Sequence, residues 1–395
     1  MKIALVCPAS LPATQFGGIL FLCVDIAKES SNIGHYVTIY TTDLDFANNP
    51  NTFNKKLPRS EMLDNFEIKR SHVWFSLGLF FVNPGMYFQM IKDNPNVIHS
   101  IGIRSFQSFV AALISRRKKI PLVISDQGGL TTHPDLKNST LVKKILYKLQ
   151  TPMIRFVINQ AMKISVANEY EEEIFSKLVD KSKIVIVRNG INVKSLMESK
   201  SIEFKQKYNL KCDYFLFLGR FSKIKGIDIL LHAINLIKNT HEMSNTILVI
   251  MGVDFGFQTE MFDMIDKFKI QNKVIVIKNP PREDVIAAYK NCKFLVLPSR
   301  WELSPLTPLE GFVFKKPVIS TNTHGIPYTI ENGKNGILVE LENPRELSKA
   351  IIELLTNNKK CIEYGNAGYN MVINEYNSKK MVSDTLKIYE EVANR

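Results

Sequence analysis

Cysteine is scarce in this sequence and long apolar runs are missing, and each absence argues against whole classes of protein. The five cysteines are scattered and odd in number, and none has CxxC spacing, which argues against a disulfide framework and a zinc site. No apolar stretch approaches the ~20 residues that span a bilayer, and Val73–Val82 comes nearest. The apolar run in Met1–Pro8 is too short for a signal peptide. We therefore expect a cytoplasmic protein that starts with a strand.

Repeats, low-complexity tracts and the common nucleotide-binding fingerprints are missing as well. Without a fixed period, neither a solenoid nor a propeller is expected. Neither a GxGxxG nor a Walker A pattern occurs, which disfavours a Rossmann dehydrogenase that would use Gly17-Gly18 as its fingerprint. At 395 residues, with 45% hydrophobic and 23% charged residues, the chain is long enough for two globular domains that each bury a core.

Positive charge is in excess and unevenly distributed. The net charge is +13, and between Ile101 and Lys163 there are eleven Lys or Arg residues and two acidic residues, including the run Arg116–Lys119. Such a run is either the solvated end of a helix or a patch for anionic lipid head groups or phosphorylated substrates. No recognisable nucleic-acid-binding module accompanies it. An anionic membrane surface is therefore a candidate partner, and nucleic acid is not.

The order of apolar segments predicts two doubly wound α/β domains. Short β-rich segments alternate with helical patterns, and the strands lack the polar alternation of a sheet with one wet face. The predicted strands are Lys2–Cys7, Tyr36–Thr41, Asn96–Ser100, Pro121–Ser125, Tyr214–Leu218, Thr246–Met251, Val274–Ile277, Phe294–Pro298 and Pro317–Thr321. The polar stretch Arg188–Lys211 indicates a connection, so the domain boundary is expected near residue 190. Ligands should bind at the carboxyl ends of the strands.

A glycine loop with two basic residues follows the first strand of the second domain. Arg220 and Lys225 lie between Gly219 and Gly226, and an amphipathic helix starts directly afterwards. A diphosphate needs fixed positive charge and free backbone N–H groups, which Arg, Lys and a helix N-terminus supply together. The alternative is a strand-to-helix turn with exposed basic residues. The loop alone does not decide between them.

Two glutamates eight residues apart follow a later strand of the same domain. Glu302 is expected on a loop and Glu310 at a helix start. Thr307 and Glu310 have the spacing of a capping box, with Pro308 at the first helical position, which is a sufficient structural reason for Glu310. A carboxylate also accepts hydrogen bonds from the vicinal hydroxyls of ribose and hexoses. Glu302 has no capping role and is the sharper signal of a nucleotide-sugar site.

These motifs together resemble a known enzyme family. Glu302-x7-Glu310 with Gly219-Arg220 and Lys225-Gly226 resembles the retaining GT-B glycosyltransferases of family 4, also called glycosyltransferase group 1. Four further motifs support the resemblance, which covers nearly the whole chain: Gly17-Gly18, Asn189-Gly190-Ile191, Leu297-Pro298-Ser299 and Lys316-Pro317-Val318-Ile319. The Glu-x7-Glu context is specific, whereas the glycine pairs are not.

The resemblance implies an architecture and a reaction. It implies a GT-B fold with two Rossmann-like domains facing a cleft, residues 1–190 for the acceptor and 191–377 for a nucleotide-sugar donor, with a last helix at about 378–395 packing back on the first domain. The reaction would move a hexose-type sugar from a nucleotide-diphosphate donor to a glycan or lipid-linked acceptor, with retention of configuration. No metal and no cofactor are expected. Cell-surface polysaccharide or glycolipid assembly, at the cytoplasmic face of a membrane, is the expected setting.

The resemblance also assigns roles to individual residues. Arg220 and Lys225 would hold the donor diphosphate, Glu310 would bind ribose, and Glu302 would approach the sugar, so that Arg220, Lys225 and Glu302 are the catalytic candidates. The residues implied for donor binding are Gly17, Gly18, Arg220, Lys225, Glu302, Ser304, Leu306, Thr307 and Glu310.

The sequence departs from the family pattern at two places. Pro305 stands where relatives often have a glycine whose N–H contacts the donor, and a proline has no N–H to donate. Gln127 stands where many relatives have a histidine, so an acid–base role there must move, with Asp126 as a candidate. The acceptor-side candidates are His99, Arg104, Asp126 and Gln127. An inactive GT-B-like scaffold that binds nucleotide or glycan is the alternative function.

The segment Val73–Val82 is unusually aromatic. Its expected role is core packing in a strand and a helix. A surface that faces lipid or the acceptor is the alternative.

Overall fold

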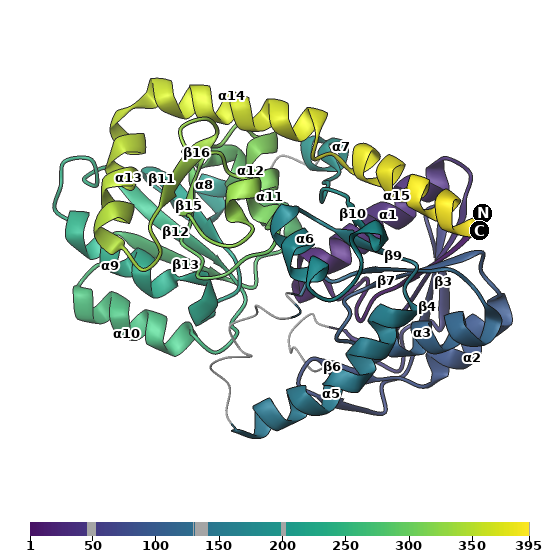
Figure 1. The fold of residues 1–395 in the computed structure, drawn as a ribbon. Helices are drawn as coiled ribbons and strands as arrows, with labels where there is room; N and C mark the ends of the chain where they lie inside the picture. The colour runs from purple at the N-terminus through teal and green to yellow at the C-terminus, as the bar shows by residue number, and fades with distance from the viewer. Residues whose placement is uncertain (46–52, 129, 131–140, 199–202, 395) are drawn as a thin grey trace. The chain divides into compact units, whose positions relative to one another are not determined.

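The computed structural model describes residues 1–45, 53–128, 130, 141–198 and 203–394 (Figure 1). The chain forms two compact units, Met1–Gly190 together with Ser378–Arg395, and Ile191–Asn377. The chain therefore leaves the first unit at Gly190 and returns to it for its last helix. The predicted connection is partly helical, with α7 (Val193–Met197) and α8 (Phe204–Lys207) in the second unit. Residues 199–202 lie outside the described residues.

The first unit contains an eight-stranded sheet in the order β10-β9-β8-β7-β1-β2-β4-β3. Only β3 is antiparallel to its neighbour. The strands are β1 (Lys2–Val6), β2 (Tyr36–Thr42), β3 (Ser60–Leu63), β4 (Phe66–Ser71), β7 (Val97–Ile101), β8 (Leu122–Ser125), β9 (Lys163–Val166) and β10 (Ile184–Ile186). β2 pairs with one edge of β1, whereas β7 pairs with the other edge of β1. The strand order thus switches between β1 and β7, where an open α/β sheet binds ligands.

Helices cover both faces of this sheet, and each face has its own core. β1 sends Ala4 and Val6 into one apolar core and Ile3 and Leu5 into the other, as expected for a strand buried on both faces. The helices are α1 (Gly18–Asn32), α2 (Gly85–Asp93), α3 (Phe106–Lys118), α5 (Leu141–Gln160), α6 (Glu169–Ser176) and α15 (Ser378–Ala393). α1 and α15 share one core, to which α15 contributes the fully buried Tyr389.

The aromatic segment Val73–Val82 forms a hairpin, which corrects the expectation of core packing in a strand and a helix. β5 (Phe75–Leu77) pairs with β6 (Phe80–Val82) in an antiparallel ribbon. Val73, Phe81 and Val82 are buried, but four other apolar side chains are exposed. A short apolar run has no period that distinguishes a buried strand from a half-exposed hairpin.

The second unit contains a six-stranded parallel sheet in the order β13-β12-β11-β14-β15-β16. Its strands are β11 (Asp213–Leu218), β12 (Thr246–Gly252), β13 (Val274–Lys278), β14 (Leu295–Leu297), β15 (Val318–Thr321) and β16 (Gly336–Val339). Its longer helices are α9 (Ile227–Ile237), α10 (Gln258–Phe268), α11 (Arg282–Asn291), α12 (Leu306–Val313), α13 (Pro344–Thr356) and α14 (Asn358–Asn374). The apolar face predicted for α9 is buried in the core of this unit. Here the strand order switches between β11 and β14.

Candidate functional site

Two loops meet at the switch point of the second unit. β11 and β14 are neighbours, with Leu216 paired to Leu295, so the loops that follow them leave the same edge of the sheet. The first loop is residues 219–226 and the second is residues 298–305, which are the two segments that carry the predicted charged residues. The fold alone therefore brings both motifs to the place where doubly wound sheets bind ligands.

Gly226 allows the two loops to touch. Its φ is +68°, and a Cβ built on it would lie 1.9 Å from the carbonyl oxygen of Pro298, so any side chain would collide with the second loop. The backbone N–H of Arg300 also donates to the carbonyl oxygen of Ile224 at 2.7 Å. A glycine at this position is thus required both by its left-handed conformation and by the close approach of the second loop.

Lys225 and Glu302 form an ion pair across this contact. The same carboxylate oxygen of Glu302 accepts a hydrogen bond from the Ser299 hydroxyl at 2.9 Å. The side chains of Lys225 and Glu302 are partly exposed, so a ligand can reach both. An exposed Lys on a flexible stem is free to exchange a carboxylate for a phosphate, because both offer anionic oxygens.

Arg220 lies beside the same pair. Its guanidinium stacks 4.5 Å above the centre of the Phe255 ring, a contact that fixes the plane of the fork. Burial lowers the pKa of Arg220 and the nearby Glu302 carboxylate opposes that shift; an arginine remains charged in either case. The loop therefore presents one rigid and one mobile positive charge, and the role of Phe255 was not predicted from the sequence.

Glu310 is held by an arginine and not by a helix cap, which corrects the predicted capping box. α12 starts at Leu306 with Pro305 as its N-cap residue and no side-chain cap, so Thr307 lies inside the helix. Glu310 is buried, and its two oxygens accept a forked pair of hydrogen bonds from Arg282 at the start of α11. Arg282 was not predicted from the sequence, although its place just after β13 was a usable signal.

The start of α12 offers fewer backbone donors than usual. The first N–H groups of a helix have no partner inside the helix, but Pro305 and Pro308 contribute none. Leu306 and Thr307 supply the N–H groups that remain, next to Ser304, and these three residues are partly exposed. The helix start is therefore a weaker anion site than its position suggests.

In the first unit, Gly17 and Gly18 lie after β1 at the switch point. Gly17 has a φ of +119° and is the N-cap residue of α1, which has no side-chain cap. The backbone N–H groups at the start of this helix point to the carboxyl edge of the sheet. Glycines at this position keep that edge free of side chains.

His99, an acceptor-side candidate, is buried. Its Nδ1 lies 2.6 Å from the Tyr389 hydroxyl and its Nε2 lies 2.7 Å from the Ser125 hydroxyl. Burial lowers its pKa from 6.5 to about 3, so the ring is neutral at pH 7. Both ring nitrogens are used inside the core, and the side chain joins α15 to the sheet.

The other acceptor-side candidates hold one turn together. Asp126 is buried and accepts the backbone N–H of Leu130 at 2.6 Å, and Arg104 donates to the Leu130 carbonyl oxygen. Gln127 has a φ of +54° and exchanges two amide hydrogen bonds of 3.0 Å with Asn189. These three side chains thus shape the carboxyl end of β8.

A buried carboxylate behind this turn was not predicted. Glu171 accepts the backbone N–H of Ala167 at 2.6 Å. Burial and the nearby charge of Asp126 raise the pKa of Glu171 to about 8. The signal available in the sequence was its spacing from Asn168, whose side chain caps the N-terminus of α6.

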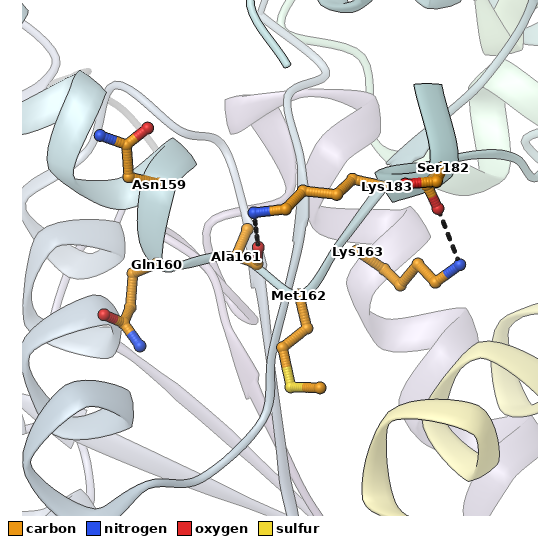
Figure 2. Close-up of a pocket in the computed structure, with 7 residues that line it drawn as sticks. All are labelled: Asn159, Gln160, Ala161, Met162, Lys163, Ser182 and Lys183. Carbon is orange, nitrogen blue, oxygen red and sulfur yellow. Dashed lines mark hydrogen bonds between the residues drawn. The ribbon is translucent and has the colours of Figure 1, made fainter. Parts of the chain in front are cut away.

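The hollow drawn in Figure 2 lies elsewhere. Lys163 and Lys183 line it, and their ammonium groups donate to the carbonyl oxygens of Ser182 and Ala161 (Figure 2). Lys163 is the first residue of β9, so this hollow opens at the amino ends of the strands. Ligands of doubly wound sheets bind at the opposite edge.

In the described part of the chain, no group of three or more His, Cys, Asp and Glu side chains is arranged to hold a metal ion. Within the same residues, no helix combines the length and apolar character needed to cross a membrane.

Solved structures identify the fold. A sucrose-phosphate synthase from Thermosynechococcus elongatus superimposes with a TM-score of 0.77 at 16% identity, covering 99% of this chain and 98% of that one. The Anabaena protein HepE, solved in complex with UDP and glucose, gives a TM-score of 0.76 at 17% identity over the whole of both chains. At such low identity the likeness defines the fold class, which is GT-B.

The sequence comparisons show which proteins this chain is similar to. Residues 198–371 match the family described as glycosyl transferases group 1. An uncharacterised glycosyltransferase from Methanocaldococcus jannaschii is 27% identical over 76% of this chain and 79% of its own length. The capsular polysaccharide biosynthesis glycosyltransferase CapM from Staphylococcus aureus is 26% identical over 75% of this chain and 77% of its own. Within its second unit, this chain is therefore similar to the group 1 glycosyltransferases.

Proposed function

We propose that this protein is a retaining glycosyltransferase that moves a hexose-type sugar from a nucleotide-diphosphate donor to a glycan or lipid-linked acceptor. The observation that supports this most strongly is the meeting of Arg220, Lys225 and Glu302 at one switch point, with Glu310 on the helix that follows. Two positive charges beside two carboxylates match a diphosphate that is linked to two sugars. The UDP-bound HepE structure has the same fold, which makes a nucleotide donor the first one to test.

The donor diphosphate takes the place of Glu302 at Lys225. Released from its ion pair, the Glu302 carboxylate turns to hydroxyls of the donor sugar, while Arg220, braced on Phe255, forms paired hydrogen bonds with phosphate oxygens. As the bond from sugar C1 to the diphosphate oxygen breaks, negative charge grows on that oxygen. Lys225 and Arg220 stabilise it without a metal, because their charges are already in place.

Retention follows from attack on the same face of the sugar. The acceptor oxygen forms its bond to C1 on the face that the diphosphate leaves, and the acceptor proton passes to the departing phosphate oxygen. No protein side chain is needed as nucleophile in this step. Asp126, Gln127 and Arg104 then act on the acceptor side by shaping the turn after β8.

Ribose binding is assigned to Glu310. Its carboxylate retains acceptor capacity after the forked bonds from Arg282, since each oxygen has two lone pairs. The proposed backbone contacts to the phosphates in the second unit are the N–H groups of Leu306 and Thr307, with Ser304 beside them. In the first unit, they are those of Gly17 and Gly18 at the start of α1. Because the helix start has lost two donors to proline, Arg220 and Lys225 carry more of the charge stabilisation.

The acceptor is proposed to be a glycan or lipid-linked intermediate of cell-surface polysaccharide or glycolipid assembly. The capsular role in the name of the Staphylococcus aureus relative supports this setting. The proposed place of action is the cytoplasmic side of a membrane, with peripheral attachment.

Two features favour an inactive scaffold as the second candidate. Pro305 removes a backbone donor next to the sugar site, and Gln127 is already paired with Asn189. A scaffold would bind nucleotide without turnover. Slow hydrolysis of the donor by the purified protein would exclude that alternative.

Calorimetric titration with UDP, GDP and ADP and their sugars tests the donor site. We expect one nucleotide to bind, and Lys225→Ala and Glu310→Ala to weaken it by about tenfold or more, since hydrogen bonds to charged groups contribute roughly 1.5–3 kcal/mol. Lys223→Ala is the matched control, because Lys223 is in the same loop but pairs with Glu260 at 3.7 Å on the surface. Folded protein that binds none of these nucleotides would rule the donor site out.

A further inference from the structure

An apolar patch lies on the surface of the first unit, formed by the β5–β6 hairpin. Trp74, Phe75, Leu77 and Leu79 have exposed fractions of 71%, 55%, 57% and 52%, and we call these four residues the hairpin patch. The whole segment Val73–Val82 carries no charge. Single exposed apolar residues are ordinary, but four within six positions form a patch of the kind that marks an interaction site.

The hairpin is held firmly from its other side. The Phe81 ring lies 5.4 Å from that of Phe53 and 6.3 Å from that of Phe16. The side-chain amide of Gln107 donates to the Phe81 carbonyl oxygen at 2.9 Å. The exposed side chains are therefore presented by a packed ribbon, so little ordering is needed when they bind.

Two lysines flank the hairpin patch. Asp43 joins the segment before these lysines to the start of the hairpin. Its carbonyl oxygen accepts the N–H of Asn54 at 2.8 Å, and its carboxylate accepts the N–H of Val73 at 3.1 Å. Lys55 and Lys56 follow Asn54 directly and are exposed. In the part of the chain that the structure describes, neither lysine has an acidic partner. An apolar tip thus stands beside unpaired positive charge.

We propose that the hairpin patch is a membrane-docking surface for an anionic lipid bilayer. Trp74, Phe75, Leu77 and Leu79 enter the boundary between head groups and acyl chains, and Lys55 and Lys56 contact the anionic head groups. The combination of one tryptophan, aliphatic side chains and a lysine edge suits this boundary, where one side of the element is apolar and the other is wet. Neither the apolar insertion nor the two lysines alone would hold the protein firmly on a membrane. Together they supply the two contributions, apolar and electrostatic, that stable attachment requires.

The hairpin lies at the edge of the sheet where the first unit is expected to bind ligands. The hairpin follows β4, which runs parallel to β2 and β1, so it leaves the same edge of the sheet as Gly17 and Gly18. Phe16, which touches Phe81, directly precedes Gly17. The purpose of the membrane contact rests on the proposed function: a lipid-linked acceptor would reach the enzyme at the edge where its first unit binds ligands. Docking itself does not depend on it.

Fluorescence of the full chain provides the first test, without any nucleotide. The protein has two tryptophans, and Trp74 is exposed whereas Trp301 is 8% exposed. We expect vesicles of phosphatidylcholine with phosphatidylglycerol to shift the emission to shorter wavelength, and brominated lipids to quench it. Trp74→Phe should abolish both signals while the protein still sediments with the vesicles. An unchanged spectrum together with no co-sedimentation would overturn the proposal.

Co-sedimentation with paired variants separates the two parts of the surface. The double change Leu77→Ser/Leu79→Ser should reduce vesicle binding about tenfold or more, because apolar burial is lost at two side chains. Phe88→Ser, on α2, is the matched control, since Phe88 is 69% exposed outside the hairpin. The hairpin change should leave nucleotide titration unaltered. A chain that binds nucleotide but not vesicles would contradict only this inference, whereas one that binds vesicles but not nucleotide would contradict only the proposed function.

Two pairs of lysine variants test the electrostatic part of vesicle binding. Lys55→Gln/Lys56→Gln should weaken binding to anionic vesicles by about fivefold per lysine, with little change on pure phosphatidylcholine. Lys118→Gln/Lys119→Gln, at the exposed end of α3, is the matched pair and should have the smaller effect. A loss confined to that pair would move membrane contact away from the hairpin and overturn the proposal. So would a dimer, seen by light scattering, that Leu77→Ser/Leu79→Ser dissociates, because the patch would then bind a second copy.

Discussion

The two units have similar sheets but differ in how the polar residues at their switch points are used. In the second unit, Lys225 and Glu302 are partly exposed and pair only with neighbours that a ligand can replace. In the first unit, His99 and Asp126 are buried and engaged in hydrogen bonds that maintain the fold. Charged side chains available to a ligand mark the second unit, whereas side chains that hold the backbone in shape mark the first.

The same difference agrees with the extent of the family match, residues 198–371, which lie in the second unit. A diphosphate is chemically constant, so Arg, Lys and carboxylates must stand at fixed places around it. An acceptor varies, and a turn held by its own hydrogen bonds can change shape with few consequences for the rest of the fold. We expect Gln127, which stands where the resemblance implies a histidine, to be a change of that second kind.

The largest effect is expected at Arg220. Arg220→Ala should reduce kcat for sugar transfer about 10²–10³-fold, as loss of one preorganised group that stabilises developing charge typically does. Arg220→Lys should recover part of the rate, because it keeps the charge but loses the planar fork. Steady-state kinetics with the donor named by calorimetry measures both. If the two variants kept the full rate, Arg220 would not take part in sugar transfer.

The next effect concerns the fold of the donor loops. Gly226→Ala should lower the free energy of unfolding by about 3 kcal/mol or more, since it adds a steric clash to a strained φ. Gly256→Ala is the matched control: its φ is +88° but no atom lies within 4 Å of its Cβ position, so only the backbone cost of about 1 kcal/mol remains. Urea denaturation measures both. Equal losses would mean that the loops do not meet at Gly226.

The sequence was sufficient for those features of the site that depend on strand order. The apolar runs predicted the parallel sheets, and the loops after β11 and β14 could be named from the residues that follow each run. The partner of Glu310 could not be found this way, because Arg282 comes from another strand and only the folded sheet brings the two together. Pairing between loops is a tertiary property that spacing along the chain does not contain.

Two local predictions failed for local reasons. The capping box required Thr307 in an extended conformation before the helix, but Pro305 already takes that position and starts α12 two residues earlier. The segment Val73–Val82 has the composition of a core element, and composition does not distinguish the side of a hairpin that faces solvent. His99 takes the structural role that a lone histidine most often has, because α15 covers this strand end through Tyr389.

A pH effect should separate His99 from a ligand-binding histidine. The pKa of His99 is lowered from 6.5 to about 3, so between these values the unfolded chain binds a proton that the folded chain does not. The contribution of His99 to stability should therefore be complete above pH 6.5 and fall as the pH drops, by about 1.4 kcal/mol per pH unit. His99→Gln should flatten this part of the curve, measured by urea denaturation from pH 4 to pH 7. An unchanged slope would show that His99 titrates normally and is accessible.

The smallest effect, at Gln127, gives the sharpest test of the difference between the units. Gln127→Ala removes the amide pair with Asn189 but retains the positive φ, and it should lower the free energy of unfolding by roughly 1 kcal/mol. Gln127→Gly removes the same hydrogen bonds but relieves the φ, so it should be close to neutral. Both changes take away the side chain and should raise the acceptor KM equally if the amide also binds a sugar hydroxyl. Gln127→Ala could instead raise the acceptor KM without any loss of stability. The amide would then act on the ligand, and the first unit, like the second, would present a side chain to the ligand.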